Sequence, residues 1–197
     1  MTAETKARKR ELRSELIAAR ARLSQEERLE RSQQVGERVD ALPLLAAARV
    51  VAIYASLGTE VDSSVLYRRL HARGLRCLFP RSVPGERRLV FCPCEPWELV
   101  RGPLGAAEPP PGAREVDLGD VDAFVMPGVG FSLDGLRLGR GGGYYDATLK
   151  QAPRAVRIGV GFDLQVLPEL PRDPHDVPLD ALVTESRALL FPRGAAA

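Results

Sequence analysis

The 197-residue sequence has little cysteine or histidine and no long apolar segment. Its three cysteines (Cys77, Cys92 and Cys94) are an odd number without C-x-x-C spacing, and only His71 and His175 could join them around a metal. This pattern argues against a disulfide framework and against structural zinc. No apolar run approaches the roughly 20 residues that span a bilayer. We therefore expect a soluble protein of the reducing cytoplasm with no membrane partner.

A strong excess of charge is also missing. Lysine and arginine total 28, aspartate and glutamate 26, and the formal net charge is +2. A nucleic-acid binder driven by bulk charge is disfavoured by this balance. The charged start is not followed by an apolar segment, so we expect no secretory signal. Basic residues do cluster locally near the start, as a candidate anion-binding patch: Lys6, Arg8, Lys9, Arg10 and Arg13.

Two helices are predicted within residues 1–42. Apolar residues of the first share one face at helical spacing: Leu12, Leu16, Ala19 and Leu23. Ser24 and Glu27 form a capping-box pattern that starts the second helix. Its apolar stripe is expected to continue through Leu29, Val35 and Val39, and Pro43 marks its end.

The remaining chain alternates between strand and helix patterns. The continuous apolar run at 50–55 is typical of a strand buried on both faces, and further strands are predicted at 122–126 and 156–162. Asp62 is a candidate cap for a helix that ends at Gly74. This alternation predicts an α/β fold, a three-layer sandwich with a mostly parallel or mixed central sheet flanked by helices.

The same pattern sets expectations for the rest of the chain. Further strands are expected at 75–79 and 181–184, with an edge strand at 188–191 and irregular structure over 80–115 that contains one strand at 89–92. We expect one domain over 1–197, with 1–42 as a helical segment packed on it and 194–197 frayed.

A glycine-rich segment lies between the strand at 122–126 and a short helix predicted at 144–150. Residues 126–146 read MPGVGFSLDGLRLGRGGGYYD. Glycines allow positive φ and close backbone approach, and free N–H groups at a helix start suit phosphate. Arg137 and Arg140 add charge-assisted donors. No Lys-Ser/Thr pair follows the glycines, so this is not a Walker A loop, and a flexible crossover loop is the alternative.

Three smaller features are candidates for ligand contacts. Lys9 and Arg13 share a helix face, where a bound anion would offset their repulsion; a solvated face is the alternative. Glu60 follows the first central strand, where parallel-sheet enzymes bind ligands, although it could simply be exposed. Asp146 and Asp176 could serve Mg²⁺, which prefers one or two carboxylates with phosphate oxygens and water. Turn roles are the alternative for these aspartates.

Together these segments resemble the 5-formyltetrahydrofolate cyclo-ligase family. The matching pieces are KRELR at 9–13, YASLGTEVD at 54–62, the segment 126–146, and HDVPLDALVTE at 175–185. The resemblance implies an ATP- and Mg²⁺-dependent cyclisation of 5-formyltetrahydrofolate to 5,10-methenyltetrahydrofolate, with release of ADP and phosphate. ATP phosphorylates the formyl oxygen, and N10 of the substrate then attacks the activated carbon.

The resemblance also implies site residues. Contacts to ATP would come from Lys9, Arg10, Arg13, Arg137, Leu138, Gly139, Arg140, Gly141, Gly142, Gly143, Tyr144 and Tyr145. Within this set, Arg140 and Lys9 would act in catalysis. Contacts to folate would come from Ala55, Glu60, Tyr144 and Trp97, although Trp97 could equally be a core or rim residue. The metal would be held by Asp146 and Asp176.

Two other functional classes remain open from the sequence. A sugar-phosphate isomerase or a CoA-transferase-like enzyme on a related scaffold would bind phosphate at the glycines without needing ATP. A non-enzymatic protein would store reduced folate or bind RNA through its basic first helix. The near-neutral charge disfavours RNA, so we expect small-molecule partners, no nucleic acid, and a monomer or weak homodimer.

Overall fold

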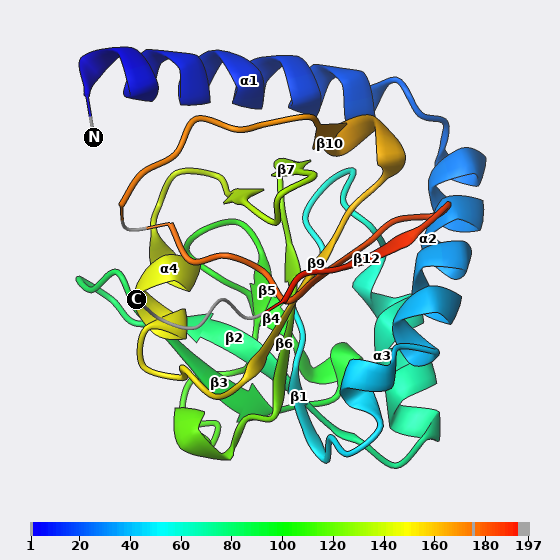
Figure 1. Cartoon of the computed structure of the whole chain (residues 1–197). Helices are drawn as coiled ribbons and strands as arrows, with labels where there is room; N and C mark the ends of the chain where they lie inside the picture. Colours follow the sequence, from blue (N-terminus) through cyan, green and yellow to red (C-terminus); the bar gives the residue numbers. More distant parts are fainter. Residues whose placement is uncertain (1, 175, 193–197) are drawn as a thin grey trace.

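The computed structural model describes residues 2–174 and 176–192 (Figure 1). The predicted frayed end, 194–197, and His175 lie outside the described residues. The centre of this described part is a seven-stranded sheet in the order β12-β11-β9-β6-β1-β2-β3. Its strands are β1 (Val50–Ala52), β2 (Arg76–Ser82), β3 (Leu89–Pro93), β6 (Ala123–Pro127), β9 (Val156–Val160), β11 (Ala181–Val183) and β12 (Ala188–Leu190).

The interior of the sheet is parallel. Strand β1 pairs in parallel with β2 and β6, β6 pairs with β9, and β9 pairs with β11. The edge strands β3 and β12 run antiparallel to their neighbours β2 and β11. This arrangement confirms the predicted mixed, mostly parallel sheet. Strand β1 is shorter than its apolar run predicts, but Ile53 still donates its backbone N–H to the Leu78 carbonyl at 2.8 Å.

Helices cover both faces of the sheet (Figure 1). They are α1 (Ala3–Ala21), α2 (Gln25–Asp40), α3 (Ser63–Ala72) and α4 (Tyr144–Leu149). Alternation along β6 divides the core: Ala123 and Val125 join the cluster with residues of α2 and α3, whereas Phe124 and Met126 join the cluster that contains Leu149 of α4. The sheet is thus the middle of three layers, as the strand pattern predicted. No helix among the described residues has the length and apolar character of a membrane span.

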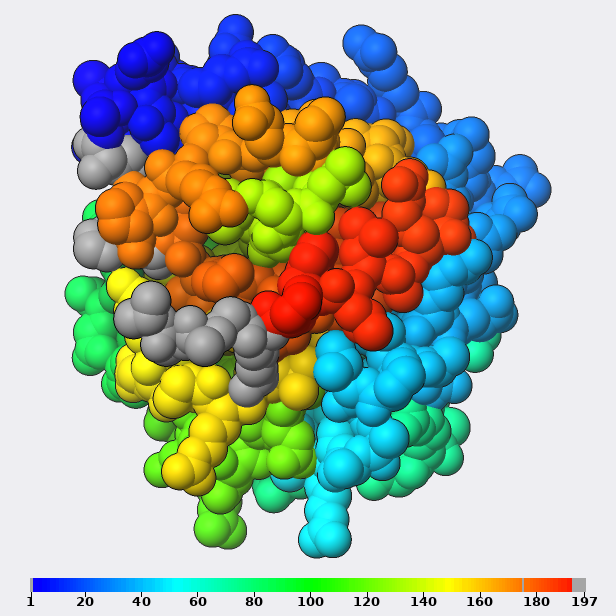
Figure 2. All heavy atoms as spheres, viewed as in Figure 1, coloured from blue at the N-terminus to red at the C-terminus, as the bar shows by residue number. Residues whose placement is uncertain are grey.

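The first helix crosses the end of the sheet and does not lie along its face (Figure 1). Leu12 of α1 packs in a small cluster with Leu138 and Leu170. In the space-filling view the blue surface of α1 lies against the orange surface of the segment that follows β10 (Figure 2). Two segments that are far apart in the sequence are therefore neighbours on the surface of the molecule.

Local capping signals in the sequence are confirmed. Ser24 Oγ accepts from Glu27 N at 3.1 Å, while Glu27 Oε2 accepts from Ser24 N at 2.7 Å. Asp62 caps α3 by accepting from Ser64 N at 2.9 Å. The predicted stripe of α2 is wrong at Leu29, which is 50 % exposed. Leu29 lies about one turn before the first buried residue of α2, Ser32, at the edge of the face that α2 buries.

Two small sheets were missing from the sequence prediction. One consists of β7 (Gly130–Ser132), β8 (Arg137–Leu138) and β10 (Val166–Leu167), and the other of β4 (Val100–Arg101) and β5 (Ala107–Glu108). Their strands are two or three residues long, too short for a period-2 pattern to appear. The region 80–115 is therefore less irregular than expected, since β2 also continues to Ser82.

Truncating Phe124 tests the packing of the sheet. Its ring is fully buried and meets Phe91 edge-on at 5.3 Å between centroids. Phe124→Ala should lower the free energy of unfolding by about 3–5 kcal/mol, because it removes buried area and leaves a cavity. Leu29→Ala, at a half-exposed position of α2, should change it by less than about 0.5 kcal/mol. Urea denaturation measures both; equal effects would contradict this packing.

Candidate active site

A cleft of about 720 Å³ opens beyond the carboxyl ends of the parallel strands β1 and β6. Its walls come from the segments that follow these strands, from one face of α1, from the glycine-rich segment and from the β4–β5 hairpin. Its volume suits a small-molecule ligand, and its place is where open α/β sheets bind ligands.

Most of the predicted site residues meet in this cleft. Those that line it are Lys9, Arg13, Ala55, Glu60, the whole run from Arg137 to Asp146, and Asp176. The sequence prediction missed other lining residues: Tyr54, Arg87, Leu104, Glu108 and Lys150. Arg87, Leu104 and Glu108 lie in the region that the pattern left as irregular, so no local motif pointed to them. Tyr54 and Lys150 lie in a predicted strand and a predicted helix, but neither was singled out there.

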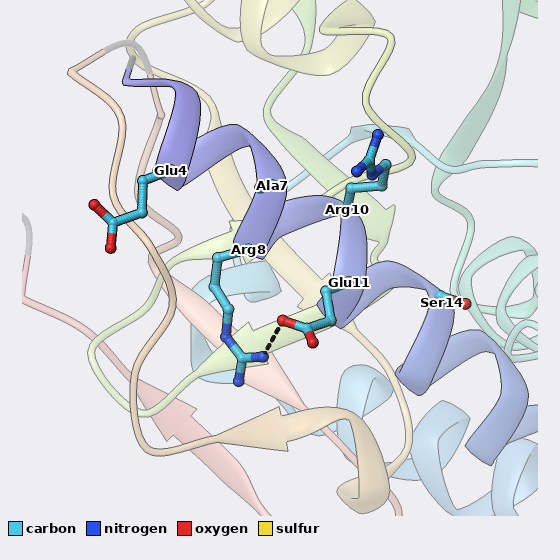
Figure 3. Close-up of a pocket in the computed structure, with 6 residues that line it drawn as sticks. All are labelled: Glu4, Ala7, Arg8, Arg10, Glu11 and Ser14. Atoms are coloured by element: carbon cyan, nitrogen blue, oxygen red, sulfur yellow. Dashed lines mark hydrogen bonds and ion pairs between the residues drawn. The ribbon is translucent and has the colours of Figure 1, made fainter.

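Arg10 and Trp97 are not among the described residues that line the cleft. Arg10 lies on the exposed side of α1, in a shallow surface where Arg8 pairs with Glu11 at 2.6 Å (Figure 3). Helical geometry explains this, because Lys9 and Arg13 share a face that Arg10 does not. Trp97 is 78 % exposed in a short 3₁₀ turn, Pro96–Glu98. The predicted ATP contact of Arg10 and pterin contact of Trp97 therefore do not fit this cleft.

The cations of α1 already have partners. Lys9 Nζ donates to both carboxylate oxygens of Asp176, at 2.7 and 3.0 Å, and Arg13 Nε donates to the Gly139 carbonyl at 2.8 Å. The expected repulsion between Lys9 and Arg13 is therefore offset within the protein, by Asp176 and by the Gly139 carbonyl. Burial lowers the pKa of the Arg13 guanidinium, an effect that Asp176 opposes, and an arginine remains charged in such a setting.

Arg20 anchors α1 deeper in the molecule. It is 2 % exposed, and its Nε donates to Thr59 Oγ1 at 2.9 Å while Nη1 approaches the Gly128 carbonyl at 3.4 Å. Gln165 Nε2 donates to the same carbonyl at 2.8 Å. Burial lowers the pKa of Arg20, and Glu60 opposes this shift. The segments after β1 and β6 are thus tied to one helix.

An ion pair joins the segment after β1 to the glycine-rich segment. Glu60 is buried, and its Oε1 accepts from Arg140 Nη2 at 2.9 Å and Nε at 3.2 Å. Its Oε2 accepts from the Leu57 backbone N–H at 2.9 Å. Both oxygens of Glu60 therefore have protein partners. Glu60 appeared remote from the glycine-rich segment in sequence, but the two are neighbours in space.

The glycine-rich segment bends sharply before α4. Gly141 and Gly143 have φ of +101° and +73°, a conformation that other residues rarely adopt. Gly143 is also the N-terminal cap residue of α4. Arg137 pairs with Asp146 at 3.3 Å and lies 5.1 Å from the centroid of the Tyr145 ring. Burial raises the pKa of Tyr145, which keeps its hydroxyl protonated near neutral pH.

Beyond the ends of the parallel strands, the cleft combines cationic side chains, glycine turns and carboxylates. This combination defines an α/β enzyme that binds an anionic small molecule. The chain belongs to the 5-formyltetrahydrofolate cyclo-ligase family, whose model matches residues 5–185. The predicted family and the prediction of an enzyme are confirmed by this match.

Relatives and solved structures agree with this family. The chain is 35 % identical over 173 residues to 5-formyltetrahydrofolate cyclo-ligase of Escherichia coli K12, covering 85 % of this chain and 95 % of that one. It is 29 % identical over 193 residues to the mouse enzyme, covering 90 % and 93 %. The NMR structure of Aquifex aeolicus 5,10-methenyltetrahydrofolate synthetase aligns with TM-score 0.81 and 34 % identity, covering 96 % and 95 %.

A double-mutant cycle tests the Lys9–Asp176 pair. Lys9→Met and Asp176→Leu should each lower the free energy of unfolding by about 2–4 kcal/mol, because each leaves a largely buried charge without its partner. The double variant should lose less than the sum, by about 1–3 kcal/mol. Chemical denaturation of the four proteins measures the coupling. Strictly additive losses would show that the contact contributes nothing.

Proposed function

We propose that this enzyme cyclises 5-formyltetrahydrofolate to 5,10-methenyltetrahydrofolate with consumption of ATP in the presence of Mg²⁺. The observation that carries the proposal is one cleft in which Lys9, Arg13 and Arg137 gather beside glycine turns, while Ala55 and Glu60 line the same space. The names of the relatives, cyclo-ligase and methenyltetrahydrofolate synthetase, support it.

The chemistry asks for positioning and charge neutralisation more than for a protein nucleophile. The formyl oxygen of the substrate attacks the γ-phosphorus of ATP, and ADP leaves. N10 of the substrate then bonds to the formyl carbon and loses its proton, and the former formyl oxygen departs as part of phosphate. Phosphoryl transfer of this kind depends on aligned reactants and on cations around the transferred group.

Residue roles follow from the lining of the cleft. ATP contacts are assigned to Lys9, Arg13 and the run Arg137–Tyr145, with Lys9 and Arg140 stabilising the charge on the transferred group. Folate contacts are assigned to Ala55, Glu60 and Tyr144. Arg140, which is half-exposed and paired with Glu60, would exchange that partner for a phosphoryl oxygen when ATP is bound.

The carboxylates fit an ion that arrives with the nucleotide. Asp146 and Asp176 line the same cleft, and the described residues contain no cluster of three metal-ligating side chains. Mg²⁺ needs no such cluster, since phosphates and waters complete its coordination. When bound, the ion would neutralise phosphate charge. Arg137 and Lys9 hold the two carboxylates in place through their side chains.

A direct assay tests the reaction. The methenyl product absorbs in the near ultraviolet where the substrate does not, so that band should appear only when ATP is present. One phosphate should be released for each product formed. Folate binding without turnover would favour the storage protein, and absence of both binding and turnover would favour an unrelated enzyme on this scaffold.

Replacing Asp146 tests the metal assignment. Asp146→Asn should lower turnover at limiting Mg²⁺ by at least about tenfold, and excess Mg²⁺ should restore part of it. Asp120→Asn, an exposed acidic residue outside the cleft, is the matched control and should leave the Mg²⁺ dependence unchanged. Thermal unfolding checks that both variants are folded. Wild-type activity of Asp146→Asn at limiting Mg²⁺ would remove this residue from the metal site.

A further inference from the structure

The ion pair between Arg140 and Glu60 joins a residue assigned to ATP with a residue assigned to folate. The two residues are 80 positions apart in the chain, yet Glu60 Oε1 accepts from Arg140 Nη2 at 2.9 Å and from Nε at 3.2 Å. Both also line the cleft. A side chain that one ligand would use is therefore bound to a side chain that the other ligand would use.

The two partners differ in how far they are exposed. The side chain of Arg140 is 49 % exposed, whereas that of Glu60 is 6 % exposed. The guanidinium can therefore turn toward a phosphoryl oxygen by rotation about its own side-chain bonds, without disturbing the core. The carboxylate is held in place, because its second oxygen accepts from the Leu57 backbone N–H at 2.9 Å. An exchange of partners thus moves Arg140 and leaves Glu60 in the wall of the cleft.

A second cation stays near Glu60 when Arg140 turns away. Arg20 is buried, and its Nε donates at 2.9 Å to Thr59, the residue next to Glu60. Burial lowers the pKa of Arg20, Glu60 raises it and Arg140 lowers it, so Arg20 is within electrostatic range of both members of the pair. Glu60 therefore keeps a nearby positive charge. An ionised carboxylate only accepts hydrogen bonds, so its released oxygen is open to the N–H donors of a folate.

Breaking this ion pair is a step that both ligands share. A phosphate that takes Arg140 leaves the buried Glu60 without its closest cation, which costs free energy. A folate donor that approaches Glu60 Oε1 has to compete with the same guanidinium. When both ligands bind, the pair is broken once and each member gains a new partner. The second ligand therefore meets no such cost, whichever ligand binds first.

We propose that the Arg140–Glu60 ion pair couples the two substrates, so that ATP and 5-formyltetrahydrofolate each bind more tightly when the other is bound. This inference rests on the proposed function. Linkage requires the same factor in both directions, and couplings between sites commonly change affinities by about fivefold to 150-fold. The complex that holds both reactants is thereby favoured over either complex with one reactant.

Calorimetric titration without turnover measures the coupling. The dissociation constant of 5-formyltetrahydrofolate is determined alone and with a saturating non-hydrolysable ATP analogue and Mg²⁺. In wild type the analogue should lower this constant at least about fivefold, and saturating folate should lower the constant of the analogue by the same factor. Folate affinities that agree within about twofold in the two conditions would overturn the proposal.

Two variants separate coupling from a structural role of the pair. Arg140→Gln removes the competitor of folate, so folate alone should bind more tightly than to wild type, and the analogue should change this affinity by less than about twofold. Glu60→Gln removes the assigned folate contact, so folate should bind more weakly in both conditions, again with less than about twofold coupling. If the pair only maintained the shape of the cleft, both variants would weaken folate binding. That result, or coupling that persists in either variant through direct contact between the ligands, would contradict the proposal.

Arg69→Gln is the matched control. Arg69 of α3 pairs with Glu37 of α2 at 2.9 Å, the same length as the Arg140–Glu60 contact, and neither residue lines the cleft. Its replacement should leave the coupling of wild type unchanged, and loss of coupling in this variant too would count against the proposal. Thermal unfolding checks that the three variants are folded.

The two levels of the proposal fail separately. Conversion of 5-formyltetrahydrofolate by wild-type enzyme with ATP tests the reaction and involves no variant. If wild type converts the substrate but the two ligands bind independently, only the coupling is wrong. If wild type neither binds nor converts the substrate, the proposed function is wrong, and the coupling is wrong with it.

Discussion

The cleft depends on one buried guanidinium. Arg20 carries its charge into the interior of the molecule and is stabilised there by Thr59 and Gly128, on the segments that follow β1 and β6. A buried charge is costly unless it is hydrogen-bonded, so α1 is held where these partners are. The same helix places Lys9 and Arg13 in the cleft. The position of Lys9 and Arg13 in the cleft therefore depends on Arg20, which is not among the described residues that line it.

Ion pairs then connect the charged side chains that line the cleft. Arg140 reaches Glu60, Arg137 reaches Asp146, and Lys9 reaches Asp176. The cleft thus carries many charges but little uncompensated charge. A polyanion that binds together with a divalent cation brings charges of both signs into the cleft. Each cationic side chain would exchange its carboxylate for the polyanion, and Asp146 and Asp176 would exchange their cationic side chains for the metal ion, so neither aspartate would lose its partner.

Much of this arrangement was predictable, and the failures have physical causes. The apolar run of β6 and the capping box at Ser24 are local, so the sequence displays them directly. The partners Lys9–Asp176 and Arg140–Glu60 are distant in sequence, and no local pattern encodes them. Arg20 did carry a signal that went unused: it follows Leu12 and Leu16 at four-residue spacing, which puts a charge on the buried face of α1.

The contact between Lys9 and Asp176 spans 167 positions of the chain. Contacts of such high sequence separation close large loops and are expected late in folding, after the helices and neighbouring strands have formed. During synthesis, α1 is made long before the segment near Asp176 and cannot complete its side of the cleft until that segment follows. The appearance of a working cleft is therefore tied to a late contact and not to the early formation of α1.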